Sequence, residues 1–150
     1  MAGELQFCTF YLGDLYFGIE VLSVQEVIRE QATTRVPLAH PAINGLINLR
    51  GQIVEAIDLR VRLGLPPRDG SASPMNVIVR TDDGPVSLLA DVIGDVVSVD
   101  ESSFETPPDT LRASARDLIT GVYKLNNRLL LVLDTTKVLQ LDDAATIESR

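Results

Sequence analysis

Tryptophan is absent from this sequence of 150 residues, and cysteine and histidine each occur once. A single cysteine cannot form an internal disulfide or build a zinc cage. Cys8 lies in an apolar run, which predicts a core or near-core position in a protein of a reducing compartment. A catalytic thiol needs a nearby base, and the one candidate, His40, lies between Ala39 and Pro41 in a turn-like stretch.

Long apolar runs and an excess of basic charge are also missing. The longest uninterrupted apolar run, residues 129–133, is far shorter than the roughly 20 residues that span a bilayer. The N-terminus lacks a basic region followed by an apolar stretch, so we expect no secretory signal and a cytoplasmic protein. The net charge of −8 argues against nucleic-acid binding, which draws most of its affinity from contacts with phosphates.

Sequence motifs that carry catalysis are not found. There is no GxxxxGK[ST] or GxGxxG loop for a phosphate, no GxSxG nucleophile and no HExxH metal motif. The paired acids at 82–83, 100–101 and 142–143 are interpreted as solvated turns or tail. We therefore expect no catalysis, cofactor or metal. A small β-barrel enzyme and a ligand-binding barrel module stay as alternatives, because barrels host many kinds of site.

The residues that are present favour an all-β fold whose core consists of valine, isoleucine and leucine. Short β-rich runs alternate with turn residues, a pattern typical of barrels and sandwiches. The expected strands cover residues 6–12, 15–19, 75–80, 86–90, 92–99, 120–125 and 128–133, and two more lie within 45–58 around a turn at Arg50-Gly51. A brief turn and a strand are predicted over 20–28, short helices over 59–65 and 135–141, loops over 68–74 and 101–117, and a polar tail over 142–150.

An internal repeat supports this interpretation. Residues 43–65 align without a gap onto residues 119–141, an offset of 76, and six positions are identical. Asp58 and Asp134 occupy matching places before the two short helices, where each can accept hydrogen bonds from backbone N–H groups. We infer one domain over residues 1–150 that consists of two similar, interleaved β-barrels, with repeat units at about 5–66 and 75–141.

Charges that the repeat does not share are better candidates for function than the shared frame. Arg50 follows Asn48-Leu49 at a predicted hairpin tip, and its repeat counterpart is Asn126. The alternative, which the local sequence alone slightly favours, is a solvated hairpin arginine. Glu26 lies in a β-branched neighbourhood and is either a surface charge or an interface group.

These residues belong to stretches in which the chain resembles the CheW family. The most specific match is Asn48-Leu49-Arg50-Gly51 followed by Asp58-Leu59-Arg60. Further matches lie at residues 10–13, 17–19, 24–27, 36–37, 43–54, 91–93 and 119–122, so that the resemblance covers about residues 7–141. The chain departs from the family pattern at Ala56 and Ala90, where bulkier apolar residues are common.

The resemblance implies two five-stranded SH3-like β-barrels with short helices, related by a pseudo-two-fold internal repeat. It also implies a non-catalytic adaptor that binds the regulatory domain of the histidine kinase CheA and the cytoplasmic tip of chemoreceptors. An adaptor of a non-chemotaxis pathway with the same residues is the alternative. Carried over by motif, the residues at or near the receptor-binding groove are Val24, Glu26, Arg50, Asp91, Val92 and Val97.

Overall fold

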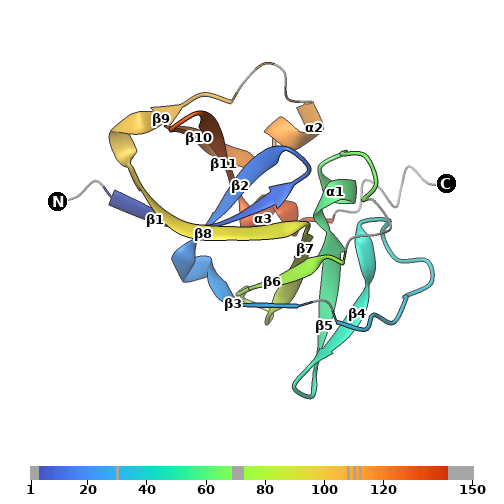
Figure 1. Cartoon of the computed structure of the whole chain (residues 1–150). Helices are drawn as coiled ribbons and strands as arrows, with labels where there is room; N and C mark the ends of the chain where they lie inside the picture. The colour runs from blue at the N-terminus through green and yellow to red at the C-terminus, as the bar shows by residue number, and fades with distance from the viewer. Residues whose placement is uncertain are drawn as a thin grey trace.

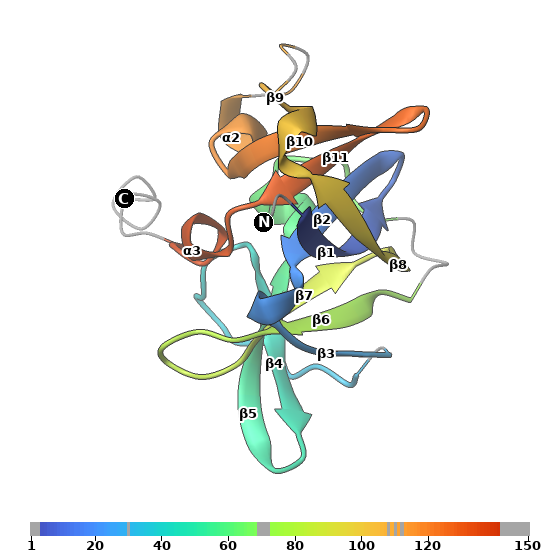
Figure 2. The same ribbon diagram turned by 90° about the vertical axis from the view of Figure 1, so that its left-hand side faces the viewer.

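The strands of the protein form two sheets, which appear as two lobes in Figures 1 and 2. The computed structural model describes residues 4–29, 31–68, 73–107, 109, 111 and 113–141. The larger sheet contains β1 (Glu4–Leu12), β2 (Leu15–Glu20), β8 (Val92–Asp100), β9 (Phe104–Glu105), β10 (Ile119–Leu125) and β11 (Arg128–Leu133). The other contains β3 (Val24–Ile28), β4 (Ile43–Leu49), β5 (Gln52–Asp58), β6 (Met75–Val79) and β7 (Val86–Ala90).

The two sheets share one topology. Their strand orders are β3-β6-β7-β5-β4 and β8-β1-β2-β11-β10, the second extended by the two-residue strand β9. In each, the last strand of one hairpin pairs in parallel with a strand of another hairpin, β5 with β7 and β11 with β2. These are the predicted SH3-like barrels. We call them barrel B (β3 to β7) and barrel A (the strands of the larger sheet).

Each barrel contains strands from both halves of the sequence repeat. The chain begins in barrel A with β1 and β2, enters barrel B at the 3-10 turn η1 (Val21–Ser23), and returns to barrel A at Asp91. Barrel B is therefore a continuous segment inserted into barrel A. The hairpin of one half of the sequence repeat thus lies in the same sheet as the strands of the other half.

A contact between repeat-equivalent residues marks the pseudo-two-fold relation. Arg62, at the end of α1 (Leu59–Arg62), donates from Nε to the carbonyl of Val138, its counterpart at the offset of 76, over 2.8 Å. Its Nη2 donates to the carbonyls of Lys137 and Gln140, over 2.9 and 3.1 Å, at the end of α3 (Thr135–Val138). The cation thus adds hydrogen bonds at the C-terminal end of this short helix, where positive charge is favourable.

The buried apolar side chains of the described residues form three clusters. The central cluster draws buried side chains from both barrels, for example Phe10 and Phe17 with Ile57 and Leu88. Two outer clusters lie in single barrels, one around Phe7 in barrel A and one in barrel B. Because the central cluster is shared, burial of apolar surface holds the two barrels together.

Most expected elements are present. Both predicted caps form, since Asp58 accepts from the N–H of Arg60 at 3.0 Å and Asp134 from that of Lys137 at 3.1 Å. The prediction of a loop over 101–117 was incomplete, because this segment contains η2 (Glu101–Ser103), β9 and α2 (Ala113–Arg116). Cys8 is half-buried, and burial raises the pKa of its thiol. The tail 142–150 and residues 69–72 of the expected loop lie outside the described residues.

Candidate functional site

Two of the expected site residues, Glu26 and Arg50, form an ion pair on the surface of barrel B. Arg50 lies at the tip between β4 and β5 with a φ of 52°, and the side chain of Asn48 accepts from the N–H of Gly51 at 2.7 Å. This local bond holds the tip, so the side chain of Arg50 is free to leave the barrel. It is 66% exposed, whereas that of Glu26 is 25% exposed.

The pair joins the two edges of a sheet. Glu26 belongs to β3 and Arg50 follows β4, which are the opposite edge strands of barrel B. The edges approach because the twisted sheet curls on itself, and a backbone bridge between Thr34 and Leu46 lies beside β4. The hydrogen bond from Arg50 is the main cause that lowers the pKa of Glu26, with a smaller contribution from Gln25. Glu26 is therefore charged at neutral pH.

The three expected valines lie in different surroundings. Val24 is partly buried against the shared central core. Val92, at the beginning of β8, is 56% exposed. Val97 lies further along β8 and packs against the outer core of barrel A. The structure thus places Val92 in contact with solvent and gives Val24 and Val97 a share in the packing.

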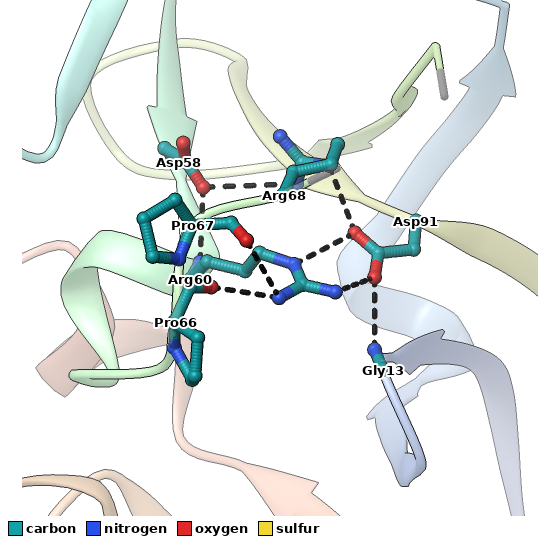
Figure 3. A network of polar contacts seen from close by, with 7 residues as sticks. All are labelled: Gly13, Asp58, Arg60, Pro66, Pro67, Arg68 and Asp91. Carbon is teal, nitrogen blue, oxygen red and sulfur yellow. Dashed lines mark hydrogen bonds and ion pairs between the residues drawn. The ribbon is translucent and has the colours of Figure 1, made fainter. Parts of the chain in front are cut away.

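Asp91 is the single residue between β7 of barrel B and β8 of barrel A, and its carboxylate is held from both sides (Figure 3). Oδ2 accepts from the backbone N–H of Gly13 in barrel A over 2.8 Å and pairs with Nη2 of Arg60. Oδ1 accepts from Nε of Arg60 over 3.1 Å and from Nε of Arg68 over 2.8 Å. The backbone N–H of Asp91 donates to the carbonyl of Tyr11 at 3.0 Å.

The cluster around Asp91 is balanced in charge. Nη1 of Arg60 donates to the carbonyl of Pro66 at 2.7 Å, and Nη2 of Arg68 lies 3.7 Å from Oδ1 of Asp58. Burial raises the pKa of the Asp91 carboxyl, but the hydrogen bonds from Arg60, Gly13 and Arg68 outweigh it and lower the pKa to about 2. Asp91 therefore acts as a charged link between the barrels.

Reasoning from the sequence missed Arg60 and Arg68 as partners of Asp91. Arg60 lies in the matching stretch Asp58-Leu59-Arg60, so the motif contained a signal, but nothing local relates it to a residue 31 positions away. Among the six expected residues, the structure brings together Glu26 and Arg50. It assigns the carboxylate of Asp91 to internal contacts, with a side chain only 12% exposed.

Three further observations concern metal ligands, the single histidine and the helices of the described residues. No group of three or more His, Cys, Asp or Glu side chains within it is arranged to hold a metal ion. His40 accepts at Nδ1 from the N–H of Ala42 over 3.0 Å, as a turn residue would. None of the described helices is both long and apolar enough to cross a membrane.

Comparison with known proteins agrees with this architecture. Residues 6–143 match the family model of the CheW-like domain. The chemotaxis protein CheW of Bacillus subtilis is 33% identical over 135 residues, which cover 90% of this chain and 86% of that protein. CheW of Klebsiella aerogenes is 29% identical over 152 residues, 99% of this chain and 92% of that protein.

The crystal structure of the scaffolding protein TtCheW from Thermoanaerobacter tengcongensis is similar as well. It superposes with a TM-score of 0.77 at 28% sequence identity, over 87% of this chain and 88% of that one. The strand topology, the match along nearly the whole sequence and the structural neighbour lead to one conclusion. The chain belongs to the CheW family.

Proposed function

We propose that this protein couples chemoreceptors to the histidine kinase CheA by binding the receptors' cytoplasmic tip and the kinase's regulatory domain. It would act in the cytoplasm, recruited to receptor arrays at the membrane. The observation that carries the proposal is the match to the CheW-like domain over residues 6–143, together with the chemotaxis proteins that share it. CheW proteins are non-catalytic scaffolds, and the chain is accordingly not an enzyme.

The surface of barrel B supports a binding role at the residues that the resemblance implies. Arg50 presents an exposed guanidinium whose partner, Glu26, lies on the opposite edge strand of barrel B. An exposed ion pair of this kind contributes little to stability, because solvent screens it. At an interface, the same groups become desolvated and decide which partner fits. The pair is therefore better suited to recognition than to holding the fold.

Two of the expected valines suit contacts with a helical partner. Val24 lies on the side of barrel B next to the shared core, and Val92 exposes an apolar side chain where β8 begins in barrel A. An amphipathic helix recognises apolar anchors that charged groups surround. We propose that receptor helices use Val24 and Val92 as apolar contacts and the Glu26–Arg50 pair as the charged rim. Val97 and Asp91 would support this surface from the barrel A side.

Reconstitution tests the proposal. Chemoreceptors in membranes, the cognate CheA kinase and this protein are combined, and phosphorylation of the kinase by ATP is followed with and without attractant. We expect the protein to raise kinase activity and to make it respond to attractant. The protein alone should not hydrolyse ATP.

A matched pair of variants tests whether the partner-binding surface includes Arg50. Arg50→Ala removes the exposed charge of barrel B, whereas Asn126→Ala changes the repeat-equivalent hairpin tip of barrel A. We expect coupling to fail with Arg50→Ala and to persist with Asn126→Ala. ATP turnover without kinase, or full coupling by Arg50→Ala, would contradict the proposal.

A further inference from the structure

A pocket of about 320 Å³ opens on barrel A, away from the expected partner residues. Its apolar wall contains three aromatic rings, Phe7, Phe104 and Tyr123. The ring centroids of Phe7 and Tyr123 are 5.7 Å apart, and Phe104 meets Tyr123 edge-on at 5.5 Å. Phe104 is 49% exposed on the short edge strand β9, so one aromatic face remains open to solvent.

Carboxylates occupy the polar side of the same pocket. Glu20, at the end of β2, and Asp134, before α3, both line it, and no lysine, arginine or histidine is among the described residues of its lining. Burial is the main cause that raises the pKa of Tyr123, and the negative charges of Glu101 and Glu20 raise it further. The pocket therefore combines aromatic faces with negative potential, and its described walls supply no cation.

A pocket of barrel B contains Asp58, the repeat counterpart of Asp134, and the surroundings of the two carboxylates differ. That pocket, of about 610 Å³, is lined by Asn44 and Asp58, the counterparts of Thr120 and Asp134, and also by Arg35. Asp58 has the guanidinium of Arg68 3.7 Å from its Oδ1 (Figure 3). Among the described residues, Asp134 has no ion-pair partner, and its carboxylate accepts only the capping bond from the N–H of Lys137.

We propose that this pocket of barrel A binds a cationic side chain, arginine or lysine, that a protein partner presents. The aliphatic stem would pack against Phe104, and the charged head would reach Glu20 and Asp134. Cations bind over aromatic faces, and paired carboxylates add charge-assisted hydrogen bonds. A protein of net charge −8 favours partners of opposite charge. None of the six residues expected at the receptor-binding groove lines this pocket, so the inference goes beyond the proposed function.

Titration with a small cation followed by NMR tests the inference without receptor or kinase. The probe is N-acetyl-arginine methylamide, and the neutral isostere N-acetyl-citrulline methylamide is its control. We expect saturable shifts at the amides of Thr120, Gly121 and Tyr123 for arginine alone, with a dissociation constant on the order of 1 mM, as one isolated side chain gives weak binding.

Variants of the pocket residues test which side chains contact the arginine probe. Glu20→Gln removes a charge whose side chain makes no hydrogen bond or ion pair with the described residues, and Asp134→Asn keeps a side-chain oxygen for the helix cap. We expect each to weaken arginine binding, and the double variant to weaken it about fivefold or more. Phe104→Leu should weaken it about threefold, because one cation–aromatic contact is lost. Glu55→Gln, an exposed acid of barrel B, is the matched control and should change nothing.

Three results would overturn the inference. These are equal shifts with the citrulline probe, shifts spread over the acidic surface of both barrels, and unchanged binding by Glu20→Gln at an unchanged melting temperature. The single Glu20 variant keeps the test decisive even if the double variant does not fold. Because the titration needs no partner protein, its failure would leave the proposed coupling function untouched.

Discussion

The two barrels have the same topology and opposite ways of using charge at equivalent places. In barrel B, the tip between β4 and β5 carries Arg50, which pairs with Glu26 on the far edge strand. In barrel A, the hairpin from β10 to β11 has Asn126 at that position, and its cation is Arg128. Arg128 stacks over the ring of Tyr16, 4.1 Å from its centroid, and bonds the hydroxyl of Tyr11.

The two aspartates that cap the short helices also differ in the charge of their surroundings. Asp58 of barrel B has the guanidinium of Arg68 nearby, whereas Asp134 of barrel A faces an aromatic pocket with no basic residue among its described walls. The residues that are identical in both barrels include a glycine, leucines and the aspartate that caps the short helix. The charged groups around it have diverged between the two barrels.

The largest expected effect concerns two equivalent glycines. A Cβ at Gly45 would lie 2.5 Å from the carbonyl oxygen of Thr34, a backbone atom, at a φ of 155°. A Cβ at Gly121 would overlap the ring of Phe104, but this side chain is half-exposed and can swing outward. We expect Gly45→Ala to cost about 3 kcal/mol and Gly121→Ala about 1 kcal/mol, as measured by urea unfolding. Equal costs would show that the backbone of barrel B yields as readily as the edge of barrel A.

The second prediction concerns the link between the barrels. Asp91→Asn leaves the charges of Arg60 and Arg68 without their shared carboxylate, at side chains only 13% and 12% exposed. We expect a loss of about 2 kcal/mol in the free energy of unfolding. Asp95→Asn, on the exposed face of β8, is the control and should be neutral. A neutral Asp91→Asn would mean that the shared apolar core alone fixes the barrels.

The pH dependence of stability follows from the same carboxylate. The pKa of Asp91 is about 2 in the folded protein, against 3.8 for an unperturbed aspartate, so the folded state favours the charged form. Its contribution is complete above about pH 4 and is lost as the pH falls towards 2. Thermal melting from roughly pH 5 down to 2 should therefore show a steeper loss in wild type than in Asp91→Asn. Parallel curves would exclude Asp91 as a source of acid sensitivity.

The fourth prediction contrasts the two tip arginines. Arg128→Ala removes a cation stacked on aromatic rings in barrel A, and we expect a loss of about 1 kcal/mol in the free energy of unfolding. Arg128→Lys, which keeps the charge but not the planar group, should recover part of it. Arg50→Ala removes only a solvent-screened pair and should leave the melting temperature nearly unchanged. A larger loss for Arg50→Ala than for Arg128→Ala would reverse the comparison.

Local patterns predicted the fold to a large extent. Gly13-Asp14 and Asn126-Asn127 marked hairpins because turn chemistry is local, and Asp58 and Asp134 marked helix starts for the same reason. The strand β9 was not predicted because two residues carry no periodic signal. Its residue Phe104 packs its ring against Gly121, which has no side chain, and this contact is not local in the sequence.

The candidate site was predictable in part. The resemblance identified Glu26 and Arg50, but no spacing rule pairs residues 24 positions apart; their contact requires that barrel B curl until its edges meet. The role of Asp91 was not predictable from the sequence. Its partners Arg60 and Gly13 belong to different barrels, and both contact Asp91 only where the two barrels pack together. Tertiary geometry, not local propensity, decides both cases.

The central claim is that Arg50 serves partner recognition and not the fold. The decisive measurement is made on wild type and Arg50→Ala, with thermal melting and titration of the receptor's cytoplasmic tip on the same samples. The account predicts unchanged melting and receptor binding weakened by about tenfold or more, which is the loss of an interface anchor. Unchanged melting with unchanged binding, or a large drop in melting temperature, would contradict it.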